Sequence, residues 1–127
     1  MSHIIIEGNL TADAEGGYGK ESGKPWARLN VAVNNRIKQQ DGTWTDGPTS
    51  FYRVIAFSSL AENAMNSLHK GDTVVVSGDL TVEGFVRQDG TNGISQEITA
   101  DHLGASLRFG TVTITITKSN KQPAAAE

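Results

Sequence analysis

The sequence predicts an all-β protein: a five-stranded barrel with one α-helix between the third and fourth strands, and an extra strand near the C-terminus. Segments rich in Val, Ile and Thr alternate with glycine-rich stretches, a pattern typical of strands joined by turns. Only one segment carries helical periodicity. The 127 residues suffice for one hydrophobic core and are too few for two ordinary domains.

Five segments are predicted to form the barrel strands. The glycine-rich stretches 15–23, 41–47 and 89–93 separate several of them, and we interpret the first stretch as a flexible loop. The long fourth strand should bend at Gly78 or Gly84, because glycine inside a strand often marks a bulge. The predicted strands are 3–10, 26–34, 49–57, 73–86 and 95–103.

The helix is predicted between the third and fourth strands. Ser59 and Glu62 have the spacing of a capping box, and Gly71 follows Lys70 as a terminator. One apolar stripe should plug the bottom of the barrel. Its residues are Leu60, Ala61, Ala64, Met65 and Leu68.

Residues 111–118 predict the extra strand. Their strict alternation places Val112, Ile114 and Ile116 on one face. Because the barrel is complete before this segment, its apolar face and free edge favour pairing with another subunit. We therefore expect one domain over residues 1–118 and a short disordered tail over 119–127.

Composition excludes several classes of protein. The chain has no cysteine, which removes disulfides and cysteine-based zinc sites, and it shows neither a membrane span nor a signal peptide. We expect a cytoplasmic location. The net charge of −3 argues against a generic nucleic-acid binder, although a locally positive groove can exist on an acidic protein.

The segment 51–57 suggests a binding surface. Alternation places Phe51, Arg53 and Phe57 on one face, opposite Val54 and Ala56. Burying an unpaired arginine in a core would be costly. A half-exposed sheet with rings for bases and a guanidinium for phosphate suits single-stranded nucleic acid, while ordinary aromatic packing is the alternative.

Further candidates lie nearby. Trp26 has the same parity as Arg28, and Trp44 lies in a segment that we interpret as a Gly- and Asp-rich loop. Each tryptophan either contacts bases or packs on protein, in the case of Trp44 on its own barrel or a neighbouring subunit. The candidates for phosphate contacts are Arg28, Arg36, Lys38, Arg53 and Arg87, and the alternative for each is a solvated surface charge.

No catalytic constellation emerges. The three histidines are dispersed, and the glycines of 16–23 lack the Lys-Ser/Thr ending of a phosphate loop. We expect a non-enzymatic protein without a metal site or a cofactor.

Several blocks together resemble the bacterial single-stranded DNA-binding proteins of the OB-fold class. They occur in the family's order and span residues 4 to about 110. The matching blocks are 4–11 (IIIEGNLT), 27–33 (ARLNVAV), 51–57 (FYRVIAF), 61–64 (AENA), 70–78 (KGDTVVVSG) and 104–108 (GASLR).

The resemblance implies an OB-fold barrel that binds and protects single-stranded DNA, independently of sequence, in replication, recombination and repair. It places Phe51, Phe57 and Phe85 where aromatic rings stack on bases, and it implies a homo-oligomer, usually a tetramer. An alternative is an OB-fold interaction or assembly subunit that has lost DNA binding. The acidic net charge and Glu83 favour that alternative.

Two departures from the family matter. Glu83 lies in a strand where relatives usually carry basic residues, which predicts weaker and more salt-sensitive binding. The chain ends in 121–127 (KQPAAAE) rather than in a long tail with an acidic, Phe-terminated tip that recruits repair proteins. We expect no such recruitment: the chain is either cut after its domain or is a phage protein or secondary paralogue, acting at the bacterial nucleoid or in a phage-infected cell.

Overall fold

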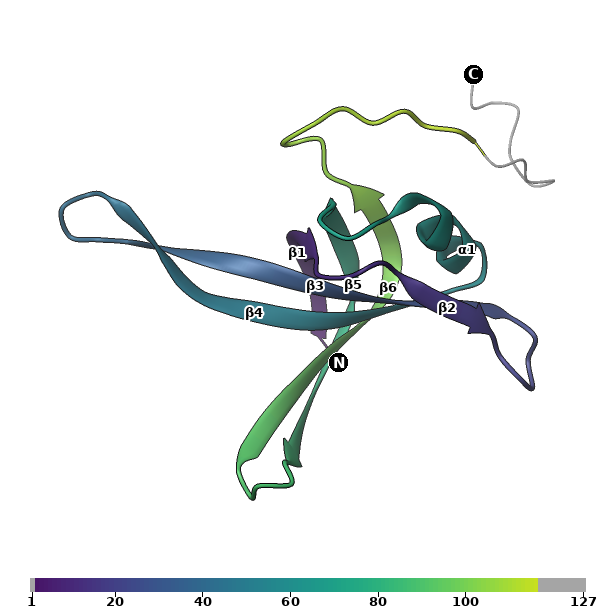
Figure 1. Cartoon of the computed structure of the whole chain (residues 1–127), viewed down its shortest axis with the longest axis horizontal. Coiled ribbons are helices and arrows are strands. Elements are labelled where there is room, and N and C mark those ends of the chain that lie inside the picture. Colours follow the sequence, from purple (N-terminus) through teal and green to yellow (C-terminus); the bar gives the residue numbers. More distant parts are fainter. Residues whose placement is uncertain (1, 117–127) are drawn as a thin grey trace.

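The computed structural model describes residues 2–116 and shows a β-barrel with one helix and with hairpins that project from the barrel (Figure 1). All five predicted barrel strands are present. The second continues beyond its predicted end to Lys38, and the third begins earlier than predicted, at Trp44. The elements are β1 Ser2–Leu10, β2 Glu15–Tyr18, β3 Pro25–Lys38, β4 Trp44–Phe57, α1 Ser58–Ser67, β5 Thr73–Val86 and β6 Asn92–Ala105.

The strands form one sheet in the order β1-β5-β6-β4-β3-β2. Pairing of Asn9 and Leu10 with β3 closes five of them into a barrel, which confirms the predicted fold class. The remaining strand, β2, extends the sheet beyond β3. Its segment was predicted as a flexible loop, and that prediction is wrong, because Gly16 lets β2 approach the backbone carbonyl of Trp26 more closely than a Cβ would permit.

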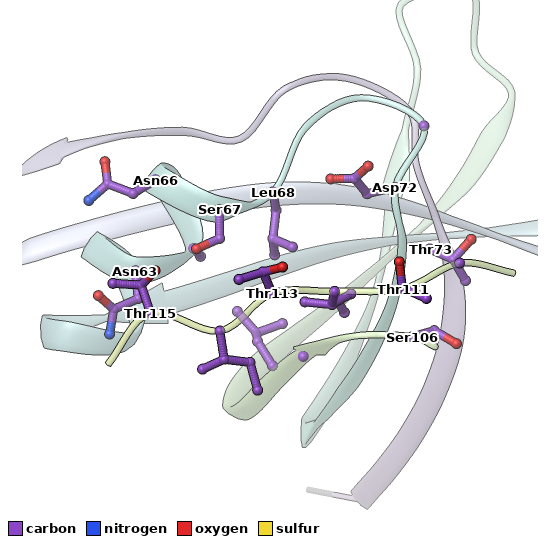
Figure 2. Close-up of a pocket in the computed structure, with 18 of the residues that line it drawn as sticks. Asn63, Asn66, Ser67, Leu68, Asp72, Thr73, Ser106, Thr111, Thr113 and Thr115 are labelled. Atoms are coloured by element: carbon purple, nitrogen blue, oxygen red, sulfur yellow. The ribbon is translucent and has the colours of Figure 1, made fainter. Parts of the chain in front are cut away.

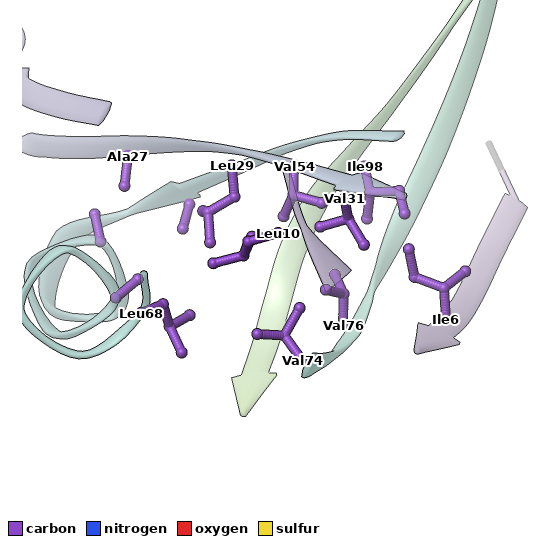
Figure 3. Packing of buried hydrophobic residues seen from close by; sticks show 13 residues of the cluster. Ile6, Leu10, Ala27, Leu29, Val31, Val54, Leu68, Val74, Val76 and Ile98 are labelled. Carbon is purple, nitrogen blue, oxygen red and sulfur yellow. The ribbon is translucent and has the colours of Figure 1, made fainter. Parts of the chain in front are cut away.

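The core lies between the strands and α1 (Figure 3). Alternate residues of β3 and β4 are fully or almost fully buried, as period-2 alternation requires. The helix contributes Ala61 and Ala64, and the stripe ends at Leu68. This confirms the predicted packing role for Leu60, Ala61, Ala64 and Leu68, whereas Met65, the fifth residue of the predicted stripe, is 36% exposed. The buried residues are Ile6, Leu10, Ala27, Leu29, Val31, Val54, Ala56, Ala61, Ala64, Leu68, Val74, Val76 and Ile98.

The predicted helix boundaries need correction. The helix begins at Ser58, its N-cap is Phe57, and no side chain caps it. Ser59 lies inside the first turn, so the capping box predicted with Glu62 does not form. β4 runs directly into the helix through a left-handed Ser58 at φ 63°. The helix ends at Ser67, and Gly71 (φ 92°) instead shapes the turn into β5, where its N–H donates to the Leu10 carbonyl at 2.8 Å.

The bend in β5 occurs at the first of the two predicted glycines. The register with β6 shifts between Ser77 and Gly78, and a Cβ at Gly78 would collide with the carbonyl of Thr99. Gly84, by contrast, pairs regularly with Ile94.

The C-terminal segment differs from its prediction. Residues 111–116 form no strand in this single chain, while 117–118 and the predicted tail lie outside the described residues. The segment passes over the C-terminal end of α1 and walls a cavity of about 920 Å³, which is lined by Asn63, Asn66 and Thr113 among others (Figure 2). Val112, Ile114 and Ile116 are exposed.

The start of this segment is anchored to β1. Ser106 Oγ donates to Glu7 Oε2 at 2.6 Å, and the Arg108 guanidinium donates to Glu7 Oε1 at 3.1 Å. These two contacts hold the pKa of the Glu7 carboxyl below its usual value. Arg108 therefore has a structural partner.

Candidate nucleic-acid interface

The outer surface of β3 and β4 gathers the aromatic and cationic candidates. Trp26 pairs with Phe57 and Ala32 with Phe51, and paired residues of an antiparallel ladder project to the same side. The opposite side of both strands is the core, so the predicted separation of faces is confirmed. We call this outer surface the binding face. Phe51 and Phe57 are 63% and 52% exposed on it.

Arg53 lies at the centre of the binding face. Its pairing partner on β3 is Asn30, and its neighbour on the parallel strand β6 is Glu97. The side chain of Arg53 is exposed, and it forms no ion pair within residues 2–116.

A bulge extends the binding face along the β3–β4 hairpin. Between Asn34 and Arg36 the register advances two residues on β3 and three on β4, from Thr49 to Asp46. One extra residue reverses which side chains face outward. Trp44 is therefore brought to the same side as Lys38, its pairing partner.

Trp44 does not lie in a loop, as predicted, but is the first residue of β4. It is 55% exposed. Arg36 and Lys38 are exposed on the same hairpin, so this arm presents one aromatic ring and two cations beyond the barrel (Figure 1).

The β5–β6 hairpin continues the binding face. Glu97 pairs with Thr81, and four residues further along β5 Phe85 pairs with Gly93. A Cβ at Gly93 would lie 2.5 Å from the Phe85 ring, so the glycine makes room for that ring. Phe85 thus shares a face with Phe51, and Glu83 lies between them on the same side.

Arg87 is engaged within its own hairpin. Its guanidinium lies 5.2 Å from the centre of the Phe85 ring and donates to the Asn92 carbonyl. Arg28 is also engaged, because its guanidinium forms an ion pair with Glu15 of β2.

The prediction missed Glu15 because its segment was interpreted as a loop. It also missed Glu97, whose proximity to Arg53 depends on the parallel pairing of strands distant in sequence.

Both hairpins end in the same turn. Residues 40–43 and 88–91 each read Gln-Asp-Gly-Thr. In each turn the aspartate Oδ1 accepts from the threonine N–H at 3.0 Å and hydroxyl at 2.7 Å. These bonds lower the pKa of Asp41 and Asp89. The glycines adopt φ near 90°, which other residues rarely do. The tips are therefore ordered turns.

The arrangement can hold a flexible polyanion with planar bases. Rings of β3, β4 and β5 offer stacking surfaces, and cations of β3 and β4, together with Arg87 just after β5, offer phosphate contacts. Residues 2–116 contain no cluster of His, Cys, Asp and Glu that could hold a metal ion, and no helix among them is long and apolar enough to cross a membrane.

These features define an OB-fold barrel with a nucleic-acid-binding type of surface. A sequence model of the single-strand binding protein family matches residues 1–106. The chain belongs to this family, which supports the prediction of a non-enzymatic protein.

Known proteins agree with this assignment. The single-stranded DNA-binding protein of Mycobacterium tuberculosis is 38% identical over 112 residues, covering 87% of this chain and 68% of the relative. That of Paenarthrobacter aurescens is 33% identical over 123 residues, covering 96% and 71%. A small single-stranded DNA-binding protein from Streptomyces coelicolor has a crystal structure that superposes with a TM-score of 0.75 at 37% identity, covering 86% of this chain and 97% of the other.

Proposed function

We propose that this protein binds single-stranded DNA independently of sequence and protects exposed strands in replication, recombination and repair. One observation carries the proposal: aromatic rings and cations share a single exposed face that runs from one projecting hairpin across the barrel to the other. Stacking tolerates any base because every base has a π-face, and phosphate contacts carry no sequence information.

The residues divide into two roles. Exposed rings on the binding face stack on bases, and we assign this role to Phe51, Phe57, Phe85, Trp44 and the half-buried Trp26. Exposed cations neutralise phosphates, chiefly Arg53, Arg36 and Lys38. Arg87 contributes once it releases the Asn92 carbonyl, whereas Arg28 is already paired with Glu15.

A fluorescence titration tests the proposal. Because Trp26 and Trp44 both lie on the binding face, oligo-dT should quench tryptophan emission at low salt, and added salt should reverse the quench. No quench at either salt concentration, with a native circular dichroism spectrum, would refute the proposed function.

We propose further that the protein assembles as a homo-oligomer, in the form of a tetramer. The edge of β1 that faces away from β5 has no partner strand from Ser2 to Gly8 within the described residues, and Ile5 on this strand is 67% exposed. An open strand edge is a template for pairing with another chain. The exposed apolar residues of 111–116 provide a second contact surface.

The valine run 74–76 contributes less to assembly than its composition suggests. Val74 and Val76 are fully buried in their own barrel, and only Val75 is exposed.

We place the assembled protein in the cytoplasm, at the bacterial nucleoid or in a phage-infected cell, where single strands become exposed.

A further inference from the structure

Arg28 differs from the other candidate phosphate ligands. Among Arg28, Arg36, Lys38, Arg53 and Arg87, it alone forms an ion pair within residues 2–116. Its partner Glu15 lies on β2, the strand added outside the barrel.

The register of β2 fixes this pair. Glu15 is the direct pairing partner of Arg28, so its carboxylate projects onto the binding face beside the guanidinium. Two residues further on, Gly17 is the pairing partner of Trp26, and the indole lies over it with ring atoms 3.7–3.9 Å from where a Cβ would be, an ordinary contact distance. The short strand β2 therefore positions a carboxylate directly beside a stacking ring and a phosphate ligand.

We propose that Glu15 masks Arg28 and thereby keeps the affinity for single-stranded DNA below the value that the binding face would reach with Arg28 free. This inference rests on the proposed function. A phosphate and a carboxylate compete for the same guanidinium donors. A phosphate that displaced Glu15 would leave the freed carboxylate beside the DNA. At about 6 Å between carboxylate and phosphate in a water-like dielectric, their repulsion corresponds to about a threefold loss of affinity, so displacement is disfavoured.

The test uses the full chain and fluorescein-labelled oligo-dT at two salt concentrations. Glu15→Gln should bind about threefold more tightly than the parent. Its salt slope should be steeper by about 0.7, because Arg28 becomes free to neutralise one more phosphate. The double variant Glu15→Gln/Arg28→Gln keeps the net charge of the parent and should bind within twofold of it, since a masked pair contributes little.

Glu21→Gln is the matched control. Glu21 is exposed in the connection between β2 and β3, so its substitution changes net charge equally without touching Arg28. Glu15→Gln binding no more tightly than Glu21→Gln would overturn the masking role. A double variant at least fivefold weaker than the parent would also overturn it, because Arg28 would then bind phosphate despite Glu15.

These results separate the inference from the proposed function. A parent chain that binds oligo-dT while Glu15→Gln matches the control refutes the masking alone. A parent chain that binds no oligo-dT refutes the proposed function and the masking with it.

Discussion

Replacing Phe51 by alanine should weaken binding to oligo-dT roughly tenfold. A phenylalanine side chain offers about 200 Å² of surface. With 63% of Phe51 exposed, about 125 Å² is available to a base, and stacking on one side covers about half of it. At about 25 cal/mol per Å², the lost contact corresponds to ~1.5 kcal/mol, or about a 13-fold change in Kd. This value lies within the ~1–3 kcal/mol typical of a base–aromatic stack.

Ile94→Ala is the matched control for this measurement. Ile94 is similarly exposed, at 69%, but it pairs with Gly84 and so projects from the opposite side of the β5–β6 hairpin to Phe85. Truncating it removes exposed apolar surface without touching the binding face. Its Kd for oligo-dT should equal that of the parent.

Fluorescence anisotropy of labelled oligo-dT gives Kd for the parent, Phe51→Ala and Ile94→Ala, and thermal unfolding checks that each variant is folded. A Phe51→Ala variant that binds within twofold of the parent would contradict the stacking role. Equal weakening by Ile94→Ala would show that the loss does not depend on the binding face.

Three further predictions concern charge and assembly. Arg53→Ala should flatten the dependence of log K on log salt by about 0.7, whereas Phe51→Ala should leave that slope unchanged, and equal slopes for both variants would reverse the assigned roles. Deleting residues 111–127 should lower the oligomer mass in analytical ultracentrifugation. An unchanged mass with a lower melting temperature would instead show that the segment packs on its own barrel. Because the folded-state pKa of Glu7 lies below 4.5, its stabilising contacts should be complete above that pH and lost as the pH falls through the folded pKa. The Glu7 carboxyl should titrate below pH 4.5 by NMR. Glu7→Gln should speed tryptic cleavage after Arg108 at neutral pH. An unchanged cleavage rate would show that the Glu7 contacts do not hold this segment in place.

The sequence predicted the barrel strands and their faces because period-2 alternation reports burial directly. Val54 and Ala56 are fully buried and Phe51 is exposed, as the pattern of β4 requires. The same reasoning placed Trp26 on the outer side of β3, where it pairs with Phe57. Gly78 was a detectable bend because a glycine inside a valine-rich strand has few other uses.

The sequence did not predict β2 or the full length of the β3–β4 hairpin. Glu15–Tyr18 contains two glycines and has little intrinsic strand propensity, so its pairing comes from the edge of β3. The hairpin tip did carry a signal. Asp41-Gly42-Thr43 is a turn sequence, and the identical turn at Asp89-Gly90-Thr91 shows that both stretches connect paired strands.

Trp44 shows why alternation alone could not define the binding face. Trp44 and Phe51 are seven positions apart, so in a regular strand the two rings would lie on opposite sides. The extra residue at Gly47–Pro48 cancels this difference: proline offers no N–H to the ladder, and Gly47 lies where a Cβ would be 2.9 Å from the Asn35 carbonyl. Because of this one irregularity, Trp44 and Trp26 lie on the same face at opposite ends of the β3–β4 ladder. Bound DNA that quenches both tryptophans must therefore extend along the whole ladder, whereas DNA held only on the barrel would leave the emission of Trp44 unchanged.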